Sequence, residues 1–270
     1  MHRVRVRRED LRVPDAQADL YLVGLGIGGL ERRTVEADEV LQSAGVILHH
    51  TAFDADLRHM YRAAVVDLES VYGADSNPTQ AYHEMAAQAL QAVRERDGGP
   101  VCFLTYGHPM YLVDSAWILM EAAKAEGISV KALPSTSFLD TVLVDLGARF
   151  DRAVQAYDAD LFYLHDVRPD IRFPVLLAQF GSFDSHQLRR SGDLYGRLSP
   201  LTRRLQEIYP SDRAVAAVLS SWRPDMAPQI SHTTIRDIDS LISSSHSGTT
   251  LFIGGSEPWA NAQPDWMKLR

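Results

Sequence analysis

The stretch DLYLVGLGIGG, residues 19–29, decides the fold class of this chain. Its first five residues form a short apolar run, which is typical of a buried strand. Gly24, Gly26 and Gly29 follow in the spacing G-x-G-x-x-G, which can hold a pyrophosphate at the start of a helix. Because glycine permits backbone angles that other residues avoid, the segment predicts a strand that ends in a tight turn.

The residues after this turn predict an alternation of helices and strands. A first helix is expected from Thr34, its N-cap, to Gly45, which ends it. A later helix is expected to begin with Asp114 or Ser115 as its cap. The expected helices and strands together cover residues 34–44, 45–50, 78–96, 101–106, 114–126 and 128–134. Such alternation predicts a mostly parallel sheet with helices between its strands.

Beyond Pro134 the pattern changes, because strands follow one another with less helix between them. One helix is expected over residues 138–147, and strands over 161–165, 174–180, 214–219, 230–235 and 249–254. We therefore predict a mixed sheet in a second α/β domain. The expected division is an N-terminal arm (1–17), an α/β domain (18–134) and a second α/β domain (135–270).

Composition excludes several classes of protein. Hydrophobic residues make up 46% of the 270 residues and the formal net charge is −8, which disfavours a nucleic-acid or anionic membrane partner. No apolar run is long enough to cross a bilayer, and no signal peptide is evident, so we expect a cytoplasmic enzyme. The single cysteine, Cys102, lies in an apolar strand and is expected to be buried. His49 and His50 should point to opposite faces of a strand, so no metal site is predicted.

The turn YGHP, residues 106–109, follows the strand over 101–106. In open α/β sheets ligands bind at the carboxyl ends of strands, so Tyr106, His108 and Tyr111 are candidates to line a site. Aromatic faces attract cations such as a sulfonium. The other interpretation is a rigid turn whose tyrosines simply pack.

The glycine turn also leaves three interpretations open. A nicotinamide or flavin site requires an acidic residue at the end of the second strand, but His49 and His50 stand there. The helix also starts late, at Thr34, rather than at the last glycine. The turn is therefore either the edge of another ligand's site, a tight turn without a ligand, or a dinucleotide site.

Three segments in this order resemble the tetrapyrrole methylases, also called class III methyltransferases. They are GLGIGG (24–29), YGHP (106–109) and LPSTSFLD (133–140), and the resemblance covers most of residues 18–255. It implies a tetrapyrrole-methylase-like fold with S-adenosylmethionine in the cleft between two α/β domains, S-adenosylhomocysteine as a product, and a homodimer. The cofactor-binding residues implied are Gly26, Ile27, Tyr106, His108, Tyr111, Ser137, Phe138 and Gln179.

Within that family, YGHP preceded by PTQAYHEMAAQAL is similar to the borosin branch, whose members methylate backbone amide nitrogens of a peptide. The resemblance makes Tyr72, Tyr82 and Tyr106 the catalytic candidates. Borosin enzymes have an arginine four residues before the second tyrosine, where this chain has Pro78, and a tyrosine where it has Glu69. A cation that lowers a phenol pKa would then have to come from elsewhere, for example from Arg58 or Arg62.

No peptide is appended to the chain, so a precursor peptide is expected to be a separate molecule. Three alternatives remain at this point: a methyltransferase of a tetrapyrrole or corrin precursor or other small molecule, a nicotinamide-dependent oxidoreductase, and an inactive cofactor-binding partner subunit. Arg168 and Arg172 would be anion contacts for a carboxylate-rich tetrapyrrole, or members of a solvated loop.

Overall fold

The computed structural model describes residues 18–71, 77–147, 153–184 and 194–256. They group into two compact units. Of the described residues, the first unit holds 18–25, Thr34–Val71 and Thr79–Ser135, and the second holds Gly26–Arg33, 77–78 and those from Thr136 onward. Each unit is described by itself.

The first unit is built on a parallel five-stranded sheet with the strand order β3-β2-β4-β1-β5. All five residues of β1 and of β4 are buried, which explains their continuous apolar runs, because both faces of a parallel sheet are covered. The prediction of a mostly parallel sheet is thus confirmed. The five strands are β1 (Leu20–Gly24), β2 (Val46–His49), β3 (Ala64–Asp67), β4 (Val101–Thr105) and β5 (Val130–Leu133).

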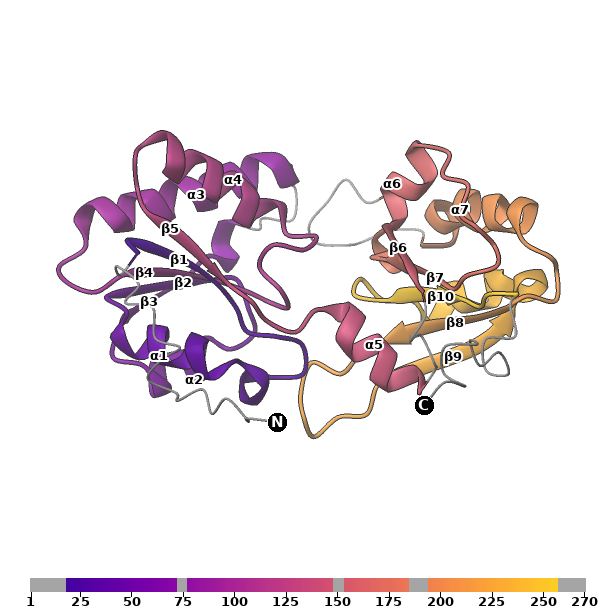
Figure 1. Ribbon diagram of the computed structural model, residues 1–270, viewed down its shortest axis with the longest axis horizontal. Coiled ribbons are helices and arrows are strands. Elements are labelled where there is room, and N and C mark those ends of the chain that lie inside the picture. Colours follow the sequence, from indigo (N-terminus) through magenta and orange to yellow (C-terminus); the bar gives the residue numbers. More distant parts are fainter. Residues whose placement is uncertain (1–17, 72–76, 148–152, 185–193, 257–270) are drawn as a thin grey trace, which may run out of the picture. The chain divides into compact units, whose positions relative to one another are not determined.

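The helices of this unit lie on both faces of the sheet (Figure 1). The connections β1–β2–β3 run toward one edge, whereas β3–β4–β5 run back toward the other. Because β-α-β crossovers are right-handed, connections in opposite directions place their helices on opposite faces. One face therefore carries α1 (Val35–Ser43) and α2 (Asp54–Met60), and the other α3 (Pro78–Glu95) and α4 (Asp114–Ala125).

The ends of these helices confirm one predicted cap and correct two others. The Thr34 hydroxyl accepts a hydrogen bond from the Ala37 N–H, as predicted. The prediction for α4 was wrong, because Asp114 is already its first helical residue and no side chain caps it. Gly45 does not end α1 through a left-handed backbone; it is glycine because a Cβ there would lie 2.2 Å from the Gly98 carbonyl oxygen.

The second unit contains a mixed five-stranded sheet, as predicted, with the order β6-β7-β10-β8-β9. Only β6 and β7 pair in parallel, and the other neighbours are antiparallel. The strands are β6 (Gln155–Asp158), β7 (Val175–Ala178), β8 (Ala214–Leu219), β9 (Gln229–Thr234) and β10 (Thr250–Ile253).

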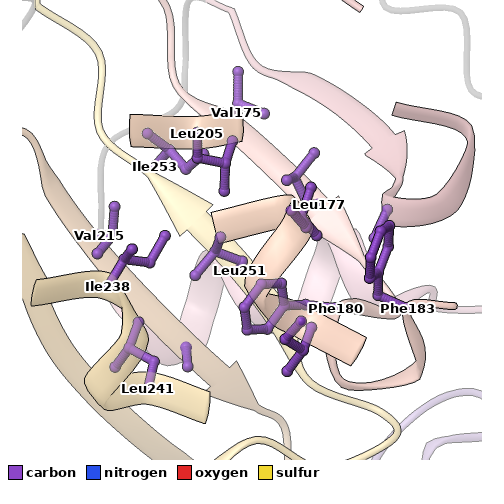
Figure 2. Packing of buried hydrophobic residues seen from close by; sticks show 14 of the residues in the cluster. Val175, Leu177, Phe180, Phe183, Leu205, Val215, Ile238, Leu241, Leu251 and Ile253 are labelled. Carbon is purple, nitrogen blue, oxygen red and sulfur yellow. The ribbon is translucent and has the colours of Figure 1, made fainter. Parts of the chain in front are cut away.

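One face of this sheet forms the larger hydrophobic core of the unit (Figure 2). Val175, Leu177 and Leu251 of the strands pack against Leu205 of α7 (Leu194–Ile208) and Ile238 of the 3-10 segment η5 (Ile235–Ser244). The other face contacts α5 (Phe138–Leu146), whose Val142 joins a smaller buried cluster with strand residues. The two faces explain why apolar residues alternate only partly along these strands.

The predicted strand over residues 161–165 is wrong, because these residues belong mostly to the helix α6 (Ala159–Leu164). The Asp158 carboxylate caps it by accepting hydrogen bonds from the N–H groups of Asp160 and Leu161. Phe162 is buried while its neighbours in the helix point outward, so one apolar turn was mistaken for a strand. No helix in the described ranges is long and apolar enough to cross a membrane.

Candidate functional site

The carboxyl edge of the first sheet brings two loops into backbone contact. The chain leaving β1 runs past β4 toward β2, and the chain leaving β4 runs past β1 toward β5, so the two connections cross. A Cβ on Gly24 would lie 2.3 Å from the Gly107 carbonyl oxygen and 2.7 Å from Pro109 Cδ. The Leu25 N–H also donates to the Thr105 carbonyl oxygen at 3.0 Å. Glycine is therefore required at the end of β1 for the loops to pass.

The turn that follows β4 holds three of the predicted site residues together. Gly107 has a φ of 78°, which favours glycine, and Tyr106 before it is 38% exposed, a large fraction for an aromatic side chain. The Nδ1 atom of His108 accepts a hydrogen bond from the Met110 N–H at 3.1 Å, which fixes the ring plane. Tyr111 is half-buried, and burial raises the pKa of its phenol. The turn thus presents an exposed aromatic face beside an oriented imidazole.

Two buried hydroxyl groups flank Gly24 at this edge. Thr105, the last residue of β4, pairs with Gly24 across the sheet and is 1% exposed. Ser135 follows β5, and its Cβ would be 2.8 Å from a Cβ on Gly24. Within the described part of the chain, neither Thr105 Oγ1 nor Ser135 Oγ has a hydrogen-bond partner. Buried hydroxyls are normally bonded, so two orphans at one sheet edge fit the polar groups of a ligand.

Sequence reasoning had missed both hydroxyls. Thr105 lies inside the run over 101–106 that the sequence predicts only as a strand, and Ser135 lies inside the segment LPSTSFLD, which was used only for the family resemblance. The available signal was their position, since each ends or directly follows a strand at the carboxyl edge of a parallel sheet.

The glycine segment itself belongs to the second unit from Gly26 onward. Gly26, Gly28 and Gly29 all have positive φ angles, and the Ile27 N–H donates to Thr136 Oγ1 at 3.3 Å. A short 3-10 turn, η2 (Leu30–Arg32), follows, and α1 starts only at residue 35. A pyrophosphate site needs the helix to start directly at the glycines, so this geometry disfavours the dinucleotide interpretation.

The remaining predicted cofactor contacts lie in the second unit. Ser137 caps α5 through a capping box, in which its hydroxyl accepts from the Leu139 N–H and Asp140 accepts from the Ser137 N–H. Phe138 packs against the smaller core cluster. Gln179 has a φ of 56° and an exposed side chain, an uncommon conformation for a residue with a Cβ.

The structure describes two of the three predicted catalytic tyrosines. Tyr72 lies outside the described residues. Tyr82 is half-buried near the start of α3, whose fully buried stripe includes Ala81 and Met85 but not Tyr82 itself. Tyr106 lies in the turn after β4 and belongs to the same unit.

The adjacent histidines at the end of β2 have separate surroundings. His49 is fully buried, and its Nε2 atom lies 3.1 Å from Asp54 Oδ1, while its Nδ1 accepts from the Thr51 N–H. Burial lowers the pKa of His50 to about 4, so its ring is neutral at pH 7. Across the described ranges, no three His, Cys, Asp or Glu side chains are arranged to hold a metal ion.

Two of the arginines proposed from the sequence, Arg58 and Arg172, are paired with aspartate carboxylates. Arg58 Nε contacts both carboxylate oxygens of Asp54, at 3.0 and 2.9 Å, on the face of α1 and α2. Arg172 forms the same kind of bond with Asp170 in an exposed loop, which supports the solvated interpretation of that segment. Arg58 belongs to α2 and Tyr82 to α3, and these two helices lie on opposite faces of the sheet (Figure 1).

Comparisons with known proteins find a methylase family and several methyltransferases. The family model of Tetrapyrrole (Corrin/Porphyrin) Methylases matches residues 19–219. A methyltransferase and type II borosin cyclic peptide precursor from Phlebiopsis gigantea is 26% identical over 242 residues, covering 87% of this chain and 42% of that protein. The dendrothelin A precursor methyltransferase from Dendrothele bispora is 24% identical over 219 residues, covering 80% and 52%. The chain thus spans about half the length of these curated relatives.

Solved structures share the fold. Uroporphyrin-III C-methyltransferase from Thermus thermophilus superposes with a TM-score of 0.60 at 19% identity, covering 88% of this chain and 92% of that one. A cobalt precorrin-4 methyltransferase gives 0.61 at 19% identity, with 90% and 96% covered. Another structure of the Thermus thermophilus enzyme, in complex with S-adenosylhomocysteine, gives 0.60 at 17% identity, with 87% and 91% covered. Because the family model matches well over half of its residues, the chain belongs to the tetrapyrrole (corrin/porphyrin) methylases.

Proposed function

We propose that this chain is an S-adenosylmethionine-dependent methyltransferase that methylates backbone amide nitrogens of a peptide. Family membership supports the methyl transfer, and the names of the borosin relatives support a peptide substrate. The observation that carries the proposal is the carboxyl edge of the first sheet. There, two orphaned hydroxyls of Thr105 and Ser135 flank a backbone crossing, beside the exposed face of Tyr106.

The residues at this edge fit the cofactor chemically. The hydroxyls can bond its polar groups, and an exposed aromatic ring attracts the positive charge of a sulfonium. When bound, the cofactor supplies an activated methyl carbon. The protein then has to align an acceptor with that carbon and exclude water, which needs neither a metal nor a protein nucleophile. We assign the cofactor contacts of the first unit to Tyr106, His108 and Tyr111.

We also assign cofactor contacts to residues of the second unit. Gly26 and Ile27 would approach the cofactor with their backbone, and Ser137, Phe138 and Gln179 with side chains. The strained backbone of Gln179 supports a functional role, because such conformations cluster at ligand sites.

The acceptor side of the site needs a proton acceptor. An amide nitrogen becomes nucleophilic only when its proton is drawn away. We assign this task to Tyr82 together with Tyr72. The peptide is proposed to be a separate molecule, and the enzyme a homodimer, which light scattering after size-exclusion chromatography measures.

Calorimetry tests the cofactor assignment. The protein is titrated with S-adenosylmethionine, S-adenosylhomocysteine, NAD⁺ and NADH, and only the first two are expected to bind. Tyr106→Ala should weaken binding by about tenfold, from the loss of about 1–2 kcal/mol of aromatic contact. Tyr195→Ala, which removes an exposed tyrosine from α7 in the second unit, is the control. Binding of the nicotinamide nucleotides alone would exclude the proposal.

Mass spectrometry tests the substrate class. Peptides co-expressed with the protein should gain one or more methyl groups on backbone nitrogens, located by fragmentation. Tetrapyrrole precursors are the alternative substrate, favoured only by the shared fold of the uroporphyrin-III enzyme. Methylation of uroporphyrinogen with no peptide methylation would exclude the peptide assignment while keeping the methyltransferase.

A further inference from the structure

Gln179 directly follows β7 and has a left-handed backbone. Its φ is 56° and its ψ is 29°, a conformation that residues with a Cβ rarely adopt. Asp166 and Asp184 also have a positive φ, but a short carboxylate side chain tolerates that region better than a glutamine does. The Gln179 side chain is exposed and makes no capping hydrogen bond to the described turn that follows it, η4 (Phe180–Ser182). The conformation of Gln179 is therefore not explained by its own side chain.

Two residues of η4 contact the turn over residues 246–249, which precedes β10. The Phe180 N–H donates to the Thr249 carbonyl oxygen at 2.9 Å, and the Phe180 side chain lies in the larger core (Figure 2). A Cβ on Gly181 would lie 2.0 Å from the His246 carbonyl oxygen. Only glycine therefore lets the two backbone segments approach each other this closely.

Further hydrogen bonds hold both segments in place. The Ser182 hydroxyl donates to the Ser247 carbonyl oxygen at 2.9 Å, and the Ser182 N–H donates to the Gln179 carbonyl oxygen at 2.8 Å. Within the turn, the His246 N–H donates to Thr249 Oγ1 at 2.7 Å, and the Thr249 N–H donates to the His246 carbonyl oxygen at 2.8 Å. Neither segment can shift without breaking these bonds, so the backbone of Gln179 is fixed between β7 and η4.

We propose that the turn over residues 246–249 positions Gln179 for the cofactor, and that Gly181 is a positioning residue that acts through Gln179. The inference rests on the proposed function, in which the Gln179 side chain contacts the cofactor, and deepens it. A primary amide offers two N–H donors and a carbonyl acceptor to the polar groups of a ligand. A backbone that is fixed before binding loses little freedom when the ligand binds, which favours affinity and explains why a strained conformation is kept.

Gly181→Ala is compared with a matched control, Gly255→Ala. A Cβ on Gly255 would also overlap a backbone carbonyl oxygen, that of Arg172, at 2.4 Å. Gly255 follows β10, whereas the turn over residues 246–249 precedes it, so this second contact lies at the opposite end of the strand from Gln179. Urea denaturation should show that both variants lose stability.

Calorimetry with S-adenosylhomocysteine then separates the two variants. Gly181→Ala should bind it about three- to tenfold more weakly, because one oriented hydrogen bond is lost, whereas Gly255→Ala should bind it as the wild type does. Equal affinities of the two variants would overturn the inference.

Gln179→Gly gives a readout that a purely structural residue would not give. Glycine adopts a positive φ without strain, so the urea midpoint should rise. The affinity for S-adenosylhomocysteine should nevertheless fall, because the amide is absent. A midpoint that does not rise, or an affinity equal to that of the wild type, contradicts the proposal that strain at Gln179 is kept for binding.

The double variant of Gln179→Gly and Gly181→Ala tests whether Gly181 acts through Gln179. Once the amide is absent, Gly181→Ala should not weaken binding further, whereas two independent effects would multiply and refute the positioning role. If Gly181→Ala does not fold, Ser182→Ala takes its place, because it removes only the side-chain bond to Ser247. Wild-type protein that binds neither S-adenosylmethionine nor S-adenosylhomocysteine would instead overturn the proposed function, so the two failures are distinct.

Discussion

Gly24 and Gly107 meet through their backbones at the carboxyl edge of the first sheet, where a Cβ on Gly24 would lie 2.3 Å from the Gly107 carbonyl oxygen. The contact follows from the strand order, because the connections leaving β1 and β4 run in opposite directions past each other. The same crossing holds Tyr106 and His108 beside the orphaned hydroxyls. One backbone contact therefore supports both the fold and the proposed cofactor site.

Gly24→Ala is expected to destabilise the first unit. The methyl group would overlap a carbonyl oxygen, Pro109 Cδ and Ser135 Cβ, none of which can move freely, so unfolding should become easier by about 2–3 kcal/mol. Urea denaturation followed by circular dichroism measures the change. Gly248→Ala is the control, because its new Cβ would meet only Leu219 Cδ1 at 3.3 Å. Equal stability of the two variants would contradict the crossing.

Ser137→Ala should lower both stability and cofactor affinity. Loss of the capping box costs about 1 kcal/mol of stability. Thr34→Ala removes a comparable cap from α1 and serves as the control for stability. Calorimetry with S-adenosylhomocysteine should show weaker binding for Ser137→Ala only. If both variants bind it as well as the wild type, Ser137 is a cap and not a cofactor contact.

The Asp19 carboxylate should make stability depend on pH in the acid range. Hydrogen bonds from Ser129, and then from Arg96, lower its pKa from the ordinary value of 3.8 to about 2. Because the folded-state pKa is depressed, its stabilisation is complete above about pH 4 and is lost as pH falls through 2. Asp19→Asn should therefore be less stable than wild type at pH 7, and the difference should shrink in denaturation curves toward pH 2.

Asp170→Asn is the matched comparison for that experiment. Asp170 also has a pKa of about 2, through hydrogen bonds from Arg172, but its partner is only two residues away. Part of such a local bond persists in the unfolded chain, so its effect on stability should be smaller. If Asp170→Asn lowered the free energy of unfolding as much as Asp19→Asn, the separation of the bonded residues along the chain would not matter here.

Cys102 should resist thiol reagents in the folded protein. Burial within β4 raises the pKa of its thiol to about 12, and the thiolate is the reactive form. Reaction with Ellman's reagent at pH 8 should be slow and should accelerate when urea unfolds the chain. Rapid labelling without denaturant would indicate that β4 opens readily.

Much of the fold was predictable because its signals are local. Continuous apolar runs at β1, β4 and β7 matched buried strands, and Thr34 capped α1 as its side chain predicts. The strand β6 was missed, since its sequence QAYD is largely polar and only pairing with β7 makes it a strand. The helix α6 was mistaken for a strand because its cap, Asp158, belongs to that same unrecognised segment.

The sequence by itself determined the alternation of strands and helices, the glycine and YGHP turns, and the family to which they belong, because periodicity and turn residues act over a few neighbours. Tertiary structure alone decided that Thr105 and Ser135 flank Gly24 and that Arg58 is paired with Asp54. Strand order and register set the first of these relationships, which joins residues from separate β-α-β units that no local pattern connects.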